Sequence, residues 1–217
     1  MNATATLRNV CLSAPFLITP MVEGATAVSN LSASDGVGHQ IIGPLGNAAK
    51  AQSFSTASSG SWTLDSIFLQ LREIGDANGN LSVAIFSEVA GSPGIELGVL
   101  TGSNPSGATN GDYEFTATAA ITLGAATTYF VVLSAPEPDL SNRYEWQLTN
   151  STSEAADPGW SIGDGSLFQG VNGAWNASSE ALKLAVNVTP VPEPGIAVLA
   201  VLGAAGLIRR RRSIASR

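Results

Sequence analysis

The chain has 217 residues, of which 44% are hydrophobic and only 12% charged, with one histidine and one cysteine. Between residues 28 and 190, four basic residues stand against fifteen acidic ones, a formal charge of −11. So acidic a segment repels nucleic acid and anionic lipid, which excludes nucleic acid as a partner. One cysteine, Cys11, excludes a disulfide framework within the chain, and no thiol-based metal or catalytic centre is expected.

The N-terminus has the order of parts of a secretory signal peptide. One basic residue, Arg8, precedes an apolar stretch over residues 10–22 that Pro15 and Pro20 interrupt. An A-T-A sequence follows at residues 25–27, which fits a signal-peptidase site with cleavage after Ala27. Residues 1–27 are therefore predicted to be a signal peptide, and a disordered N-terminus is the alternative. Cys11 lies inside this segment and lacks the L-x-x-C context of a lipid anchor.

Residues 28–53 are rich in Gly, Ser, Ala and Asn and read as a leader with weak strand content over 40–42. From residue 54 apolar and polar residues alternate in short runs, which is typical of strands. Turn signals separate the runs, at Asn78-Gly79-Asn80 and Ser92-Pro93-Gly94 among other places. The predicted strands cover residues 62–72, 81–85, 96–101, 112–118, 127–134, 143–149 and 181–188.

The run over 127–134 is β-branched and aromatic and is apolar on both faces, so a central strand is predicted there. About eight short strands without a convincing helix predict an all-β domain over residues 54–190. The favoured architecture is an antiparallel β-sandwich of jelly-roll type, and a closed barrel is the main competitor.

The last 27 residues combine an apolar run with a basic cluster. Residues 195–208 are apolar, and four arginines follow at Arg209, Arg210, Arg211 and Arg212. Fourteen helical residues span about 21 Å, somewhat short of a bilayer core, and snorkelling arginines extend that reach. The basic cluster should stay cytoplasmic, which places the folded domain outside. An amphipathic surface helix or a buried core helix is the alternative.

The residues in front of this helix are Val191, Pro192, Glu193 and Pro194. This P-E-P motif, the apolar helix and the arginine cluster together resemble the PEP-CTERM sorting signal of Gram-negative bacteria. The resemblance covers residues 191–217 and implies processing by an exosortase near the P-E-P motif. It also implies a membrane-anchored precursor that is then released to the cell surface or the exopolysaccharide matrix. The two prolines keep this segment extended and accessible to a protease.

Several segments between residues 54 and 188 resemble the choice-of-anchor R type of exported bacterial domain. These segments are G-N-L-S-V-A-I-F-S (79–87), G-S-P-G (91–94), Y-E-F-T-A (113–117), I-T-L (121–123), T-T-Y-F-V-V-L-S (127–134) and G-W-S-I-G-D (159–164). Such domains are grouped because one module occurs with different surface anchors. The resemblance therefore implies export and surface attachment and carries no chemistry.

Two candidate sites for catalysis and metal binding are weak. His39 with Asp35 would be needed for a Ser-His-Asp triad, but no G-x-S-x-G motif exists and His39 is expected simply to be exposed. Residues 76–80 begin like an EF-hand loop, yet Leu81 and Ser87 stand where a glycine and a bidentate glutamate are required. A hairpin turn explains the same residues.

No pair among the acidic residues is singled out by spacing, so no enzyme, metal or cofactor is predicted.

A sugar site is the remaining candidate. Trp160 and Trp175 lie in a polar segment with Asp157 and Asp164, and tryptophan rings beside carboxylates bind sugars in many β-sandwich modules. The alternative is that both tryptophans pack in the core, as Trp146 is expected to do. The sequence therefore predicts an exported structural or adhesive surface protein with exosortase as its processing partner, and a carbohydrate-binding module of the extracellular matrix is the alternative.

Overall fold

The structure is a computed structural model, and it describes residues 24–42, 49–77, 81–135, 141–151, 154–170 and 172–192. Within these ranges the protein is all-β, as predicted, and contains no helix. The strands are β1 (Ala25–Ser29), β2 (Asp35–Ile42), β3 (Ala49–Ser55), β4 (Trp62–Ile74), β5 (Ser82–Val89), β6 (Ser92–Gly102), β7 (Gly111–Leu123), β8 (Thr128–Ser134), β9 (Arg143–Thr149), β10 (Ala155–Ala156), β11 (Ser161–Gln169), β12 (Trp175–Ser178), β13 (Ala181–Leu182) and β14 (Leu184–Pro190).

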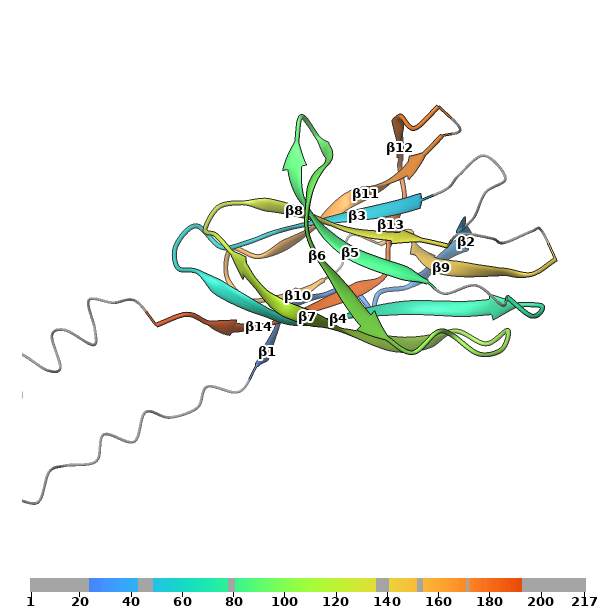
Figure 1. The fold of residues 1–217 in the computed structure, drawn as a ribbon, viewed down its shortest axis with the longest axis horizontal. Coiled ribbons are helices and arrows are strands. Elements are labelled where there is room, and N and C mark those ends of the chain that lie inside the picture. Colours follow the sequence, from blue (N-terminus) through green and yellow to red (C-terminus); the bar gives the residue numbers. More distant parts are fainter. Residues whose placement is uncertain are drawn as a thin grey trace, which may run out of the picture.

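The strands form one curled antiparallel sheet. Its strand order is β10-β1-β14-β4-β7-β6-β5-β8-β3-β11-β12, and β9 joins it by pairing with β4, β2 and β13. Figure 1 shows how the sheet bends, so that β3 and β11 lie above β4, β7 and β14. The hairpins β5–β6 and β11–β12 project from the same side of this body. The first and last described strands, β1 and β14, are direct neighbours.

Alternating residues of the central strands fill two apolar clusters. In β8, Val131 and Leu133 belong to the large cluster inside the curl, while Phe130 and Val132 belong to a small cluster on the other face of the sheet. Both valines are buried, and β8 is bordered by β5 and β3 on its two sides. The prediction of a central strand that is apolar on both faces is confirmed, and so is the burial of Trp146.

The stretch 28–53, expected as a leader, is part of the sheet. It contains the last two residues of β1, all of β2 and most of β3, and β3 lies between β8 and β11. The sheet therefore begins at Ala25 rather than at residue 54. The residues of β3 have weak strand propensity, but tertiary packing holds them in the sheet. The small side chains of Ala49 and Ala51 pack with Phe130 and Val132 in the second cluster.

The predicted turn at Ser92-Pro93-Gly94 is wrong, because these residues already belong to β6. The chain reverses at Ala90 and Gly91, whose φ angles of 50° and 78° are those of a two-residue hairpin turn with both central residues left-handed. The other predicted turn, Asn78 to Asn80, lies outside the described residues.

Both predicted targeting segments fall largely outside the described residues, since these begin at Gly24 and end at Pro192. The helix over 195–208 therefore stays a prediction. Across the described ranges, no helix is long and apolar enough to cross a membrane.

Candidate functional site

Trp160 is part of the main core. Only 5% of the residue is exposed, and its ring stacks on Phe54 at a centroid distance of 6.4 Å and meets Trp62 edge-on at 5.0 Å. A short turn brings it there, because the backbone N–H of Trp160 donates to the carbonyl of Asp157 at 3.0 Å. Core packing therefore explains Trp160, and its indole offers no open face to a sugar.

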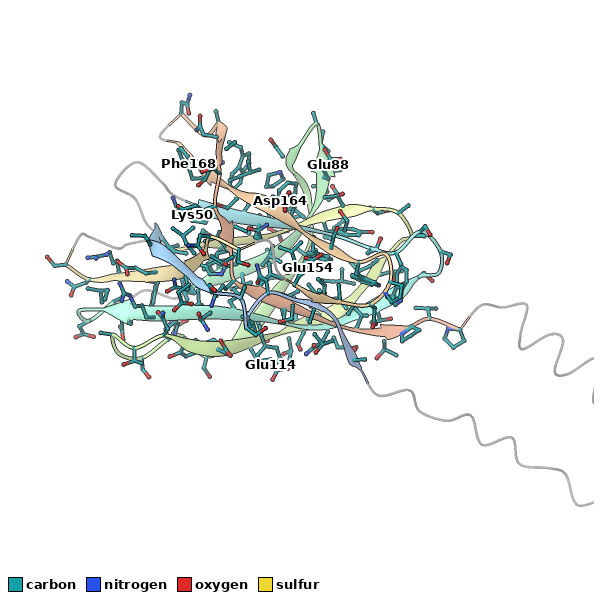
Figure 2. All side chains as sticks on the ribbon, turned by 180° about the vertical axis from the view of Figure 1, so that it is seen from behind. Lys50, Glu88, Glu114, Glu154, Asp164 and Phe168 are labelled. Atoms are coloured by element: carbon teal, nitrogen blue, oxygen red, sulfur yellow. The ribbon has the colours of Figure 1, made fainter. Side chains whose placement is uncertain are left out.

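Trp175 is half-buried and packs against the second cluster, on the other face of the sheet from Trp160. The structure therefore does not bring the two predicted tryptophans together. Asp157 and Asp164 are both exposed. Asp164 lies on β11, and Figure 2 places it near the side from which the two hairpins project.

The predicted processing signal begins directly after the last strand. Val191 and Pro192 are exposed, and the backbone N–H of Val191 donates to the carbonyl of Ser61 at 2.9 Å. Glu193, Pro194 and the arginine cluster Arg209–Arg212 lie outside the described residues.

Of the two residues weighed for catalysis, the structure describes the backbone of His39 and the side chain of Asp35. His39 lies in β2 opposite Gln147 of β9. The carboxylate of Asp35 instead binds the ammonium of Lys183, which is 3% exposed. No group of three or more His, Cys, Asp or Glu residues within the described ranges is placed to bind a metal ion.

A polar row that sequence reasoning did not identify runs across the outer face of the sheet. Residues that pair directly on antiparallel strands point to the same side, so a chain of paired residues marks one face. The row consists of Thr26 (β1), Asn187 (β14), Ser66 (β4), Thr116 (β7) and Thr101 (β6). Thr26 Oγ1 donates to Asn187 Oδ1 at 2.7 Å, and Asn187 Nδ2 donates to Ser66 Oγ at 3.0 Å.

Beside this row lies an aromatic residue that neither core uses. Phe68 of β4 pairs with Glu114 of β7 and Ala185 of β14, which places all three on the outer face. Phe68 is half-buried and packs against neither apolar cluster. Glu114 is exposed and makes no hydrogen bond or ion pair within the described part of the chain. Figure 2 shows it on the side of the molecule away from the two hairpins.

The same face carries an open hollow of about 480 Å³. Its walls are hydroxyl, carboxylate and aromatic groups from β6, β7 and the start of the loop that joins them: Thr101, Gly102, Ser103, Asp112, Tyr113, Glu114 and Thr116. Asp112 Oδ1 accepts a hydrogen bond from Gln70 Nε2 at 3.1 Å, so it is held in position from β4. Phe68 does not line the hollow but pairs with Glu114 at its edge, so this face combines hydrogen-bonding groups with an aromatic ring beside them.

Part of this face is visible in the sequence. In the predicted strand 112–118, Glu114 and Thr116 alternate with Tyr113 and Phe115, so a polar face opposite the core follows from the period of two. The register between β4, β7 and β6 does not follow from any one strand, and only that register puts Phe68 beside Glu114.

The charged groups at the β2 end of the sheet are engaged in structural contacts. Glu145 of β9 is buried and accepts from Arg72 Nε at 2.7 Å and from Arg143 Nε at 2.7 Å. Burial by itself would raise the pKa of Glu145, but the hydrogen bonds and charges of the two arginines outweigh it and lower that pKa.

No protein-family model and no curated protein matches the chain.

Proposed function

We propose that this chain is an exported protein that its C-terminal tail sorts to the cell surface or to extracellular polysaccharide, where it has a structural or adhesive role. The observation that carries the proposal is the order of parts in the tail, with P-E-P at 192–194, the apolar run 195–208 and four arginines at 209–212. An exosortase is the processing enzyme under this proposal, and the precursor is held in the inner membrane until it is cut.

The arrangement of the domain's two ends supports the proposal. Ala25 at the start of β1 pairs with Val188 near the end of β14, so the described part of the chain begins and ends at one place, seen at the left in Figure 1. Val191 and Pro192 follow β14 at once and are exposed. The exposure of these two residues, the first of the V-P-E-P segment, supports access of a protease to this point of the chain.

The decisive experiment is replacement of Pro192, Glu193 and Pro194 by alanine in the native organism. The apolar run and the arginines are unchanged, so we expect a full-length, membrane-bound form to accumulate on a gel of cell fractions. Replacement of Ser213 and Ile214 by alanine is the matched control in the same tail and should leave processing intact. Normal release of the triple variant would overturn the sorting proposal.

The curl of the sheet supports an architectural proposal as well, a two-layered antiparallel sandwich of jelly-roll type. Phe54 of β3 and Val186 of β14 belong to one apolar cluster, although their strands lie far apart in the strand order. Two layers that face each other across this cluster would account for the shared core.

A carbohydrate-binding role in the extracellular matrix is the second candidate function. The polar outer face favours it, because the half-buried ring of Phe68 lies beside the hydrogen-bonding groups of Glu114 and of the threonines of β6 and β7. Retardation of the protein by polysaccharide in a native gel tests this role. Absence of retardation by any polysaccharide would remove this candidate and leave the sorting proposal unaffected.

A further inference from the structure

We propose that the outer face of β4, β7 and β6 binds a neutral polysaccharide chain, with Phe68 and Glu114 as its central contacts. This inference rests on the second candidate function, carbohydrate binding, and assigns it a place and a ligand class. Phe68 and Glu114 are directly paired across β4 and β7, so one sugar ring can meet the aromatic ring and the carboxylate together.

The groups around this pair match the two faces of a sugar. A sugar ring has an apolar C–H face that packs on aromatic rings and a rim of hydroxyl groups that donate and accept hydrogen bonds. Phe68 supplies the apolar surface. The carboxylates of Glu114 and Asp112 accept from hydroxyl groups, and the hydroxyls of Thr101 and Thr116 both donate and accept.

The open shape of the site fits a polymer better than a small molecule. The hollow of about 480 Å³ lies over β6 and β7, where Thr101 and Thr116 are exposed. Beyond it the polar row passes through the buried Ser66 to the half-buried Asn187 and the exposed Thr26. Small ligands are usually held in enclosed, largely apolar pockets, whereas this hollow is open and is lined by polar groups of β6 and β7. A chain of several sugar residues can lie along such a face.

Charge selects a neutral chain over an acidic one. The ionisable groups that line the hollow are Asp112, Tyr113 and Glu114, so an acidic polymer meets like charge there. Arg72 stands two residues beyond Gln70 on the same side of β4, but its guanidinium binds the buried carboxylate of Glu145. Among the described residues, no cation lines the hollow to offset these carboxylates.

The test uses the full-length chain in mild detergent and affinity electrophoresis in native gels. The probes are three neutral polymers, dextran, galactomannan and a soluble β-glucan, and one acidic polymer, alginate. We expect retardation by at least one neutral polymer, at a concentration that leaves migration in alginate unchanged. A titration with calcium chloride alone, followed by calorimetry, distinguishes a cation site on the same carboxylates.

Two pairs of variants locate the contacts. Phe68→Leu keeps an apolar side chain of similar volume but removes the aromatic face, and should weaken binding about tenfold, whereas Phe68→Tyr should retain it. Glu114→Gln removes a charged acceptor and should weaken binding about fivefold. Glu88→Gln is its matched control, since Glu88 is an exposed carboxylate on the opposite side of the molecule in Figure 2.

Each other outcome overturns a defined part of the inference. Equal binding by Phe68→Leu, Glu114→Gln and the unaltered chain would overturn this site while carbohydrate binding itself stood. Retardation by alginate alone would overturn the ligand class. No retardation by any polymer would remove both the site and the second candidate function. Calcium binding that Glu114→Gln abolishes, without retardation by any polymer, would replace the sugar site by a cation site.

Discussion

The ammonium of Lys50 lies 5.0 Å from the centroid of the Phe168 ring, and the two residues pair directly across β3 and β11. Lys50 is only 2% exposed, and no hydrogen bond or ion pair reaches its Nζ from the described part of the chain. A ring face attracts a cation but does not replace its lost hydration. Burial accordingly lowers the pKa of Lys50 to about 8.

The first prediction concerns the pH dependence of stability that follows from Lys50. Its pKa is about 8 in the folded state against 10.5 ordinarily, so between these values the unfolded chain binds more protons. The free energy of unfolding should therefore rise with pH over this range. Below pH 8 the charged amine destabilises the fold, and Lys50→Met should add up to about 3 kcal/mol at pH 7.

Urea unfolding followed by tryptophan fluorescence from pH 7 to 11 measures this effect as the difference between the unaltered chain and Lys50→Met. The difference should shrink as pH rises through the window. Lys183→Met is the control, because Lys183 is equally buried but binds Asp35 and should lose stability when replaced. A Lys50→Met variant that is less stable at pH 7 would contradict the prediction.

The second prediction concerns Glu145, which two arginines hold. Glu145→Gln leaves Arg72 and Arg143 without their carboxylate and should destabilise the fold by about 3 kcal/mol. Folding lowers the pKa of Glu145. The ionised carboxylate therefore stabilises the fold at pH values above the ordinary carboxyl pKa, and this stabilisation is lost as pH falls through the pKa of Glu145 in the folded state. Chemical unfolding at pH 7 and at acid pH checks both statements. Glu114→Gln, at an exposed carboxylate without an ion pair, should change stability by less than about 0.5 kcal/mol.

The third prediction concerns the two-sided burial of β8. Val132 faces the second cluster and is 7% exposed, so Val132→Asp places an unpaired charge among Ala51, Phe130 and their neighbours. We expect insoluble or unfolded protein. Val99→Asp is the matched control, because Val99 is 42% exposed on β6 and should tolerate the change. Unchanged melting of Val132→Asp would mean that β8 is open on this face.

The strands that alternate cleanly were predictable, and those built from small residues were not. Residues 143–149 alternate Tyr144, Trp146 and Leu148 with polar residues, and β9 has these bounds. In β3, by contrast, Ala49, Ala51 and Gln52 carry little strand signal, yet each is buried in the sheet. Their structure is set by neighbours that lie far away in the sequence, since β3 pairs with β8 and β11.

The burial of a tryptophan could likewise be predicted only where the surrounding residues alternate. Trp146 stands in an alternating strand, and its burial follows from that position. Trp160 stands between Gly159 and β11, where no period assigns it to a face, so the sequence around it left both core and surface open. Only the contact with Phe54 and Trp62 decides for the core, and no local pattern encodes that contact.

The last prediction concerns where export cleaves the N-terminus. Cleavage after Ala27 would remove three residues of β1, including the pairs Ala25 with Val188 and Thr26 with Asn187. Ala27 itself is 1% exposed, so the lost burial and hydrogen bonds should cost about 2 kcal/mol of stability. A folded, exported protein should therefore begin at or before Ala25. N-terminal sequencing of the released protein measures this directly. A mature chain that begins at Val28 would show that β1 is shorter than the sheet register requires, and that the row of polar residues ends at Asn187.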